Sequence, residues 1–301
     1  MQLIIDRLSK TYPNGVRALH NISLTLSNGM FGLLGPNGAG KSSLMRTIAT
    51  LQEPDSGSIR LDDLDAPYHL DVLHNKTGVR QLLGYLPQEF GVYPRISARQ
   101  MLDHVARLKG IERSNERKDL VLALLDKVNL YKDRDRKLGT FSGGMKQRWG
   151  IAQALVGNPR LIIVDEPTAG LDPAERNRFY NLLSQLGEQT IVILSTHIVE
   201  DVSTLCSQFA IICHGEVLYH GEPDNAIKSL EGKIYSKRIP QNEIEKYRAG
   251  YPIISTQLKA GQLYIRIKSD EDPGNGFSPA APDLEDVYFT HISTKMDINT
   301  I

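Results

Sequence analysis

The sequence lacks three features that would narrow its function at once: an excess of one charge, a cluster of cysteines and a long apolar run. Lys and Arg number 35, as do Asp and Glu, and a formal net charge of zero argues against a large basic surface for nucleic acid. The two cysteines, Cys206 and Cys213, are not spaced as C-x-x-C and have no His/Cys cluster around them, so we expect buried free thiols. A zinc site is therefore not expected, and nothing implies an oxidising compartment.

No stretch approaches the roughly 18 apolar residues of a membrane span. The segment Met1–Arg7 lacks the basic region followed by a long apolar region that marks a signal peptide. We expect a chain that is kept in the cytosol, so that a role at a membrane requires another polypeptide to supply the span. Its 301 residues, 41% hydrophobic and 23% charged, suit one large globular domain and a smaller one.

The apolar pattern predicts an α/β fold. Strands are predicted at 3–6, 22–26, 31–34, 58–61, 82–86, 161–164, 190–194, 209–213 and 216–219, and helices at 42–51, 174–186 and through most of 97–155. Beyond about Gly221 the character changes, with strands predicted at 233–239, 253–259 and 262–268 and helices near 243–248 and 283–291. We predict a large domain at 1–220, with a helical subdomain at about 92–158, and a small α+β appendage at 221–301.

A phosphate-binding motif follows the apolar run at 31–34. Its pattern is G-x-x-x-x-G-K-[ST], a P-loop whose glycines let backbone N–H groups turn toward phosphate oxygens at a helix start. Lys41 is expected to reach the β- and γ-phosphates, and the Ser42 hydroxyl to bind Mg²⁺. A glycine-rich turn without a ligand is the alternative. The segment consists of Gly35, Pro36, Asn37, Gly38, Ala39, Gly40, Lys41, Ser42 and Ser43.

An acidic pair ends the second long apolar run. The run at 161–164 predicts a buried strand, and Asp165 and Glu166 follow it. By itself such a pair is more often a solvated end of a strand. Beside a P-loop, Asp165 is expected to hold Mg²⁺ through water and Glu166 to act as the general base on the attacking water.

A third segment, Ser142-Gly143-Gly144, is a second helix start that offers a hydroxyl and two bare amides. A lone Ser-Gly-Gly is usually a helix cap. Taken in order with the P-loop and the acidic pair, it resembles the signature of the nucleotide-binding subunit of an ABC transporter. The resemblance implies a P-loop NTPase of the ABC type, with a mixed β-core, a RecA-like α/β part and a helical subdomain. Phe141 and Met145 depart from the family's Leu-Ser-Gly-Gly-Gln but leave its phosphate-contacting core intact.

Four further positions match the family in order over roughly residues 1–220. Tyr12 matches an aromatic that stacks on adenine, and Gln88 a glutamine that senses Mg²⁺ and links to the membrane partner. Asp172 ends Ala169-Gly170-Leu171-Asp172, which matches the loop that couples the two sites of a dimer; His197 matches a histidine that contacts the γ-phosphate. The plainer alternatives are a turn tyrosine, a loop glutamine, a helix cap and a structural histidine.

What the resemblance implies can be stated by residue. ATP and Mg²⁺ are the expected cofactors, with Glu166, His197, Lys41 and Gln88 catalytic and Ser42, Gln88 and Asp165 at the metal. A second copy of the chain is expected to place its Ser142, Gly143 and Gly144 over the γ-phosphate, so that two ATPs lie in a head-to-tail homodimer. The membrane partner is a separate permease subunit, which would hold the chain at the cytoplasmic face of the cell membrane.

Several kinds of P-loop protein remain to be distinguished. ABC ATPases that act on DNA insert a long coiled coil before the signature, and those that act on ribosomes carry two cassettes; this chain has neither. A kinase or GTPase would not explain Ser142-Gly143-Gly144 or His197. Export is favoured because Phe90–Pro94 offers aromatics for a permease, and Leu284–Phe289 resembles the Leu-Glu-Asp-Val-Phe motif of drug-, antibiotic- and lipid-exporting subunits. An importer subunit, a soluble ABC ATPase without a role in transport, and a final helix that only packs on its own appendage stay open.

Overall fold

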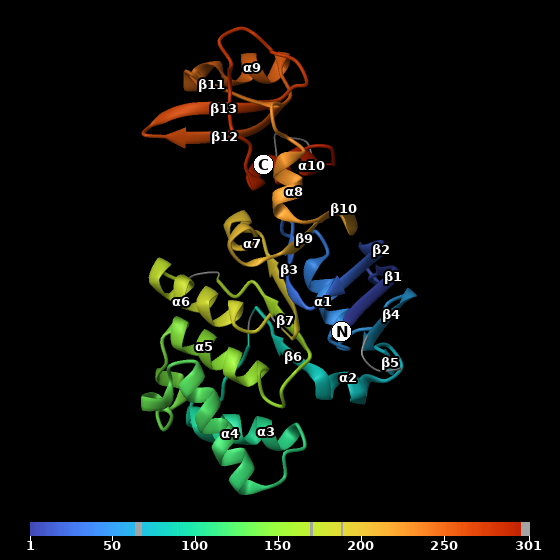
Figure 1. Cartoon of the computed structure of the whole chain (residues 1–301), viewed down its shortest axis with the longest axis vertical. Helices are drawn as coiled ribbons and strands as arrows, with labels where there is room; N and C mark the ends of the chain where they lie inside the picture. The colour runs from blue at the N-terminus through green and yellow to red at the C-terminus, as the bar shows by residue number, and fades with distance from the viewer. Residues whose placement is uncertain (64–67, 89, 169–170, 188, 296–301) are drawn as a thin grey trace.

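The computed structural model describes residues 1–63, 68–88, 90–168, 171–187 and 189–295. It contains three sheets, with the C-terminal sheet set apart from the other two at one end of the molecule (Figure 1). In these residues, no helix combines the length and the apolar character that a membrane crossing requires.

The central sheet has the strand order β10-β9-β3-β8-β7-β6. Only β10 runs antiparallel to its neighbour. Every residue of β7 and β8 is buried, as expected for strands with both faces covered. The strands are β3 (Gly29–Leu34), β6 (Leu83–Leu86), β7 (Leu161–Asp165), β8 (Ile191–Thr196), β9 (Gln208–Cys213) and β10 (Glu216–Gly221).

A second, antiparallel sheet has the order β2-β1-β4-β5. It packs its apolar face together with helix α1 (Lys41–Ile48) and residues of the central sheet in one buried cluster. Helix α2 (Lys76–Leu82) leads from this sheet into β6. The strands are β1 (Gln2–Thr11), β2 (Arg17–Ser27), β4 (Ser56–Asp63) and β5 (Tyr68–Asp71).

The predicted helical region is confirmed and consists of three helices, α3 (Ala98–Leu108), α4 (Ser114–Lys127) and α5 (Gly143–Ala154). Trp149 anchors them: it is fully buried, and its Nε1 donates to the Ala98 carbonyl at 3.1 Å. The exposed aromatic patch expected at 90–94 is smaller than predicted. Phe90 is half-buried because its ring stacks on Trp149, which leaves Tyr93, 63% exposed, as the accessible aromatic.

The C-terminal sheet has the order β12-β13-β11-β14 and its own aromatic and aliphatic core with helix α9 (Ile244–Gly250). Its strands are β11 (Ile234–Ile239), β12 (Ile253–Lys259), β13 (Gln262–Lys268) and β14 (Ser278–Pro279). The final helix α10 (Leu284–Ile292) leaves this sheet and contacts α7 (Val199–Leu205), α8 (Pro223–Lys228) and β9 as well as β12. It therefore packs on both parts of the chain and not on the appendage alone.

One buried ion pair holds α10 to the C-terminal sheet. Arg266 on β13 donates from Nε to Asp286 Oδ1 at 2.7 Å, and both side chains are buried. Asp286 also forms a capping box with Asp283 at the start of α10. Asp286 lies in the segment that resembles the exporter motif, and its contacts here are structural.

The long predicted strands and helices are confirmed, with ends displaced by a few residues. Helix α6 (Pro173–Ser184), for example, replaces the predicted 174–186. The prediction missed β5, α2, α7 and α8, each of seven residues or fewer, because so short a segment carries too little periodicity to be recognised. Cys206 and Cys213 are buried free thiols, as predicted, and burial raises the pKa of both.

Candidate functional site

The site lies where the carboxyl ends of four parallel strands meet. The P-loop follows β3, His197 follows β8, Asp165 ends β7, and Gln88 follows β6 by two residues. These strands are adjacent in the order β3-β8-β7-β6, so their ends share one edge of the sheet. The topology thereby brings together residues that are far apart in the sequence.

The P-loop borders a cavity of about 360 Å³. Gly40 adopts φ of 108°, and a Cβ there would lie 2.3 Å from the Ala18 carbonyl oxygen, so both conformation and space require glycine. Helix α1 begins at the next residue and directs its N-terminus at the cavity. The lining consists of Tyr12, Val16, Ala18, Asn37, Gly38, Ala39, Gly40, Lys41, Ser42, Ser43, Gln88 and Glu166.

Lys41 is folded back onto its own loop. Its Nζ donates to the carbonyl oxygens of Gly35 at 2.6 Å and Pro36 at 3.0 Å, and lies 3.9 Å from Glu166 Oε1. Burial lowers the pKa of the Lys41 ammonium, and the nearby carboxylates of Glu166 and Asp165 oppose that shift. The two loop carbonyls and Glu166 thus fix the position of the Lys41 ammonium.

Glu166 is the centre of the polar groups at this edge. Gln88 Nε2 donates to its Oε2 at 3.2 Å, and His197 Nδ1 lies 3.4 Å from its Oε1. Its side chain is only 11% exposed. Its backbone has φ of 47°, an uncommon conformation for a non-glycine residue, and its N–H donates to the Ser195 carbonyl at 2.9 Å. Three of the predicted residues, Lys41, Gln88 and His197, therefore each lie within 4 Å of a fourth, Glu166.

Asp165 carries a polar atom without a partner. Its Oδ1 and the hydroxyl of Ser195 are buried and make no hydrogen bond with the residues the structure describes. Burial raises the pKa of the Asp165 carboxyl; the nearby hydroxyls of Ser195 and Ser42 oppose that shift, although neither Asp165 Oδ1 nor the Ser195 hydroxyl has a partner at hydrogen-bond geometry among the described residues. An unpaired buried carboxylate oxygen near the Ser42 hydroxyl is a donor set that suits Mg²⁺, which prefers oxygen ligands. The residues present therefore fit the metal that the P-loop implies.

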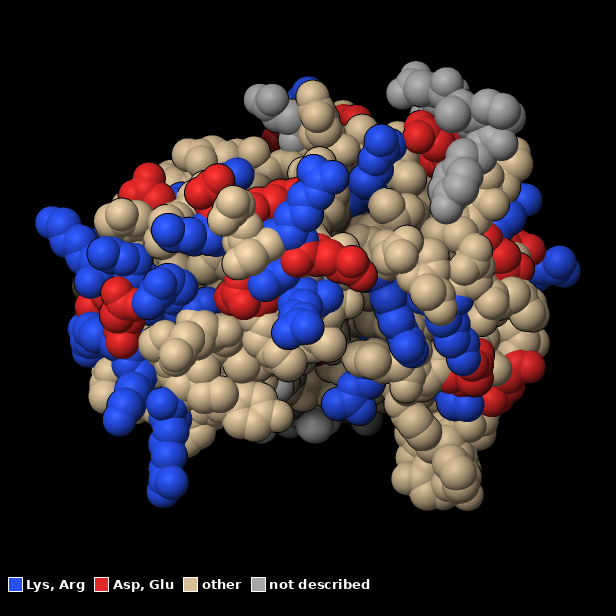
Figure 2. Space-filling model, turned by 90° about the horizontal axis from the view of Figure 1, so that it is seen from below, with Lys and Arg blue, Asp and Glu red and all other residues tan. Residues whose placement is uncertain are grey.

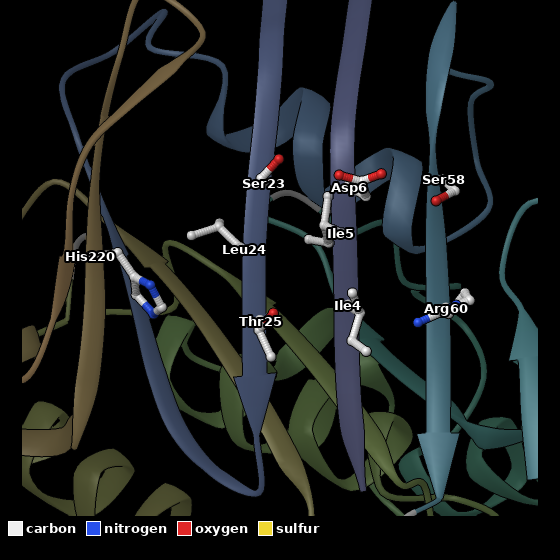
Figure 3. Close-up of a pocket in the computed structure, with 9 residues that line it drawn as sticks. All are labelled: Ile4, Ile5, Asp6, Ser23, Leu24, Thr25, Ser58, Arg60 and His220. Atoms are coloured by element: carbon white, nitrogen blue, oxygen red, sulfur yellow. The ribbon is translucent and has the colours of Figure 1, made fainter.

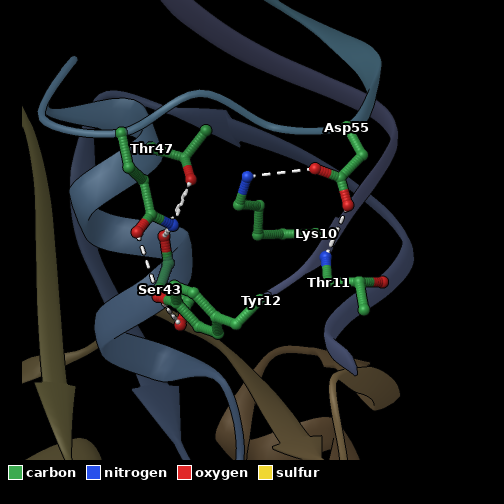
Figure 4. A network of polar contacts seen from close by, with 7 residues as sticks. Lys10, Thr11, Tyr12, Ser43, Thr47 and Asp55 are labelled. Carbon is green, nitrogen blue, oxygen red and sulfur yellow. Dashed lines mark hydrogen bonds and ion pairs between the residues drawn. The ribbon is translucent and has the colours of Figure 1, made fainter. Parts of the chain in front are cut away.

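Tyr12 closes the other side of the cavity. Its hydroxyl is 3.0 Å from Ser43 Oγ and donates to Gln52 Oε1 at 3.0 Å, which fixes the ring against α1 (Figure 4). The preceding residue, Thr11, donates its N–H to Asp55 at 2.6 Å. Gln52 and Asp55 thus hold the Tyr12 loop, and sequence analysis singled out neither because no motif marks them.

The signature segment is not part of the cavity. Ser142 caps α5, accepting from the Met145 N–H at 3.2 Å, and Ser142 and Gly143 are exposed. Asp172 likewise caps α6, accepting from the Glu175 N–H at 2.8 Å. Ser142, Gly143, Gly144 and Asp172 are absent from the cavity lining. The Ala169-Gly170 part of the predicted coupling loop lies outside the described residues.

A larger cavity, of about 460 Å³, lies on the face of β1, β2 and β4 with His220 of β10 at its side (Figure 3). Its lining contains no predicted site residue, and side chains such as Asp6 and Arg60 are exposed there. This cavity has the greater volume, but the smaller one is lined by the P-loop, Gln88 and Glu166. We therefore assign the candidate functional site to the smaller cavity.

Comparison with known proteins decides the family. Residues 19–169 match the family described as "ABC transporter". The chain belongs to the ABC transporter family. The ATP-binding protein NatA of Bacillus subtilis is 37% identical to this ABC cassette over 217 residues, covering 71% of this chain and 85% of NatA. The daunorubicin/doxorubicin resistance ATP-binding protein DrrA of Streptomyces peucetius is 33% identical over 270 residues, covering 88% of this chain and 77% of DrrA.

A solved structure gives the same assignment. The dimeric post-hydrolysis structure of the ATP-binding cassette MJ0796, bound to ADP and Pi, is similar to this ABC cassette with a TM-score of 0.65 and 26% identity. The match covers 73% of this chain and 98% of that one. The predicted ABC-type α/β fold is confirmed, and this ABC cassette is an ATP-binding ATPase. The roles of the individual site residues stay predictions.

Proposed function

We propose that this ABC cassette powers export of a drug, antibiotic or lipid-like compound through a separate membrane subunit. Two copies close head to tail, each placing Ser142 and Gly144 over the ATP held by the other's P-loop. One observation carries the dimer: Ser142 and Gly143, which are expected to contact phosphate, are exposed and lie outside the cavity that the P-loop lines.

Gly143 makes this argument specific. A Cβ at Gly143 would meet nothing within 4 Å, and its φ is not among the positive values, so the fold of this chain does not require glycine there. Glycine in a helix costs about 1 kcal/mol relative to alanine. The close approach of something outside the chain, such as a phosphate held by a second copy, gives a reason for a glycine at this exposed position.

The proposed cycle assigns a task to each side chain. ATP binds with its adenine against Tyr12, and Lys41 exchanges its loop carbonyls for phosphate oxygens. Mg²⁺, when bound at Asp165 and Ser42, neutralises part of the phosphate charge. Glu166 takes a proton from the attacking water while His197 contacts the γ-phosphate. ATP and ADP differ in affinity for the closed dimer, and that difference drives opening and closing.

A mixing experiment tests the dimer. Lys41→Ala disables a P-loop, whereas Ser142→Asp keeps a helix cap but places a negative charge at the predicted γ-phosphate contact. Each variant alone should be inactive. A mixture forms heterodimers with one intact site, and at random pairing about a quarter of the wild-type ATPase activity should return if the sites are independent. A mixture as inactive as its components would overturn the head-to-tail model, and Ser142→Asp mixed with itself is the matched control.

The helical part of the cassette is the proposed contact with the permease. Residues 92–158 hold fourteen Lys and Arg against seven Asp and Glu, although the whole chain is neutral. Figure 2, seen from the side of α3 and α4, shows Lys and Arg gathered on this face. Tyr93 and Ile96 are also exposed, and they flank Pro94 and Arg95 in the sequence. An apolar and basic surface of this kind suits an amphipathic, acidic segment of a partner.

Capture from native membranes tests the permease. The tagged Glu166→Gln chain is solubilised with ATP and Mg²⁺, and one multi-span membrane protein at near-equal stoichiometry is expected. Tyr93→Ala combined with Arg95→Glu should reduce that capture. Arg178→Glu, a charge change on α6 outside residues 92–158, should not. Recovery of ribosomes or DNA in place of a membrane protein would favour a soluble ABC ATPase, and a permease with a substrate-binding partner would favour an importer.

A further inference from the structure

A carboxylate that no motif marks lies behind the site. Asp201, on α7, is fully buried. It accepts hydrogen bonds from Thr168 Oγ1 at 2.8 Å, from Thr196 Oγ1 at 2.6 Å and from the Tyr180 hydroxyl. No ion pair to a cation is found for it in the described part of the chain. Burying a carboxylate costs several kcal/mol unless hydrogen bonds compensate, so three hydroxyl donors on one carboxylate form a fully satisfied network.

The three donors come from the segments that carry the reaction. Thr168 is two residues beyond Glu166, and Thr196 immediately precedes His197. Thr196 Oγ1 also accepts the N–H of Ile198 at 2.9 Å, so the backbone is held on both sides of His197. Tyr180 adds α6, the helix that Asp172 caps. The Asp201 side chain thus joins three segments: the loop after β7, the end of β8 and helix α6.

Glu166 needs such support. Its left-handed backbone conformation costs about 1–3 kcal/mol and persists only where the surrounding structure holds it. One direct backbone bond, from Glu166 N–H to the Ser195 carbonyl, joins the two loops at this point. Asp201 adds a second link between the same two segments, because Thr168 and Thr196 both donate to its carboxylate.

We propose that Asp201 is a positioning residue for ATP hydrolysis, which fixes the separation of Glu166 and His197 through the hydroxyls of Thr168 and Thr196. The inference rests on the roles proposed above for those two residues. Displacing a reacting group by about 1 Å can cost up to about 100-fold in rate. Asp201 does not touch the P-loop cavity, so the rate should change without a matching change in ATP affinity.

The test separates rate from binding. Asp201→Ala removes Oδ2, the oxygen that accepts from both threonines and that the amide oxygen of an Asn could replace, so kcat should fall about 10- to 100-fold while the Kd for ATP stays within about twofold. Glu200→Gln is the matched control, because Glu200 is the adjacent residue on α7, exposed and paired only at the surface with Arg176. It should leave kcat and Kd unchanged.

A double-mutant cycle identifies the route. Thr196→Val should lower kcat, Thr196→Ser should retain it, and the Asp201→Ala/Thr196→Val double variant should be no slower than the slower single variant. Wild-type kcat in Asp201→Ala, or rate losses that multiply in the double variant, would overturn the proposal. If Asp201→Ala does not fold, Thr168→Val and Thr196→Val each remove one of the two donors to Oδ2 and give the same test. Full activity in His197→Ala would instead refute the proposed site.

Discussion

Two helix starts in this molecule, those of α1 and α5, carry glycines for different reasons. Gly40 precedes α1 in a left-handed conformation, with no room for a Cβ beside the Ala18 carbonyl. Gly143 begins α5 on the surface, in open space and with an ordinary conformation. The fold therefore explains the first glycine and does not explain the second. On the proposed function, the second glycine leaves room for a phosphate held by another copy of the chain.

The buried helix start should give the largest combined loss, because ATP binding and ATPase activity fall together. Lys41→Ala removes the one ammonium inside the P-loop, and ATPase activity should fall by about 10²–10³-fold, with most ATP binding lost. Binding of a fluorescent ATP analogue and phosphate release measure both quantities. Lys10→Ala, at the nearby surface ion pair with Asp55, is the control. Near-normal turnover in Lys41→Ala would refute the P-loop assignment.

Removing the general base should separate binding from chemistry. Glu166→Gln retains a hydrogen-bonding side chain but cannot accept a proton from water, so hydrolysis should fall by about 10²–10⁴-fold while ATP still binds. Because hydrolysis no longer reopens the dimer, the variant should accumulate as a dimer with ATP. Light scattering with and without ATP measures this. A variant that binds ATP and stays monomeric would count against closure by the cassette alone.

The comparison itself is tested by the same substitution at both helix starts. Gly143→Ala should leave thermal stability unchanged or raise it by up to about 1 kcal/mol, yet lower ATPase activity roughly tenfold. Gly40→Ala should destabilise the isolated cassette, because alanine fits neither its φ nor its surroundings. Denaturant unfolding and ATPase assays on the two variants are sufficient. If Gly143→Ala retains full activity, the argument for a ligand from a second copy fails.

The smallest effect is expected at Tyr12. Tyr12→Phe loses the contacts to Ser43 and Gln52 and should cost about 1 kcal/mol of stability, while ATP affinity changes little because the ring remains. Tyr12→Ala removes the ring and should weaken ATP binding by about tenfold. Equal affinity in Tyr12→Ala and Tyr12→Phe would mean that the ring does not contact adenine.

Sequence patterns picked out residues that the structure places at one edge of the central sheet, while their roles stay predictions. The P-loop, the pair Asp165-Glu166 and His197 were located because each follows a long buried strand and has a distinctive chemistry. The prediction that Phe90 is exposed was wrong, because its ring stacks on Trp149. Trp149 is nearly sixty residues further along the chain, so no local pattern indicates this contact. Asp201 gave no signal, because one carboxylate in a short helix looks like any other acidic residue until its three donors are known.

The sequence by itself determined the nucleotide chemistry of this protein, because glycine, lysine and carboxylate at fixed spacing after apolar runs are local properties of the chain. Tertiary structure alone decided which residues meet. The parallel strand order brings Gln88, Glu166 and His197 to one edge, and the fold leaves Ser142 exposed and away from it. It also decided that α10 packs on α7 and β9 of the cassette, while the Arg266–Asp286 pair holds α10 to the C-terminal sheet. Contacts of this kind depend on how distant segments pack, and local residue patterns do not encode that packing.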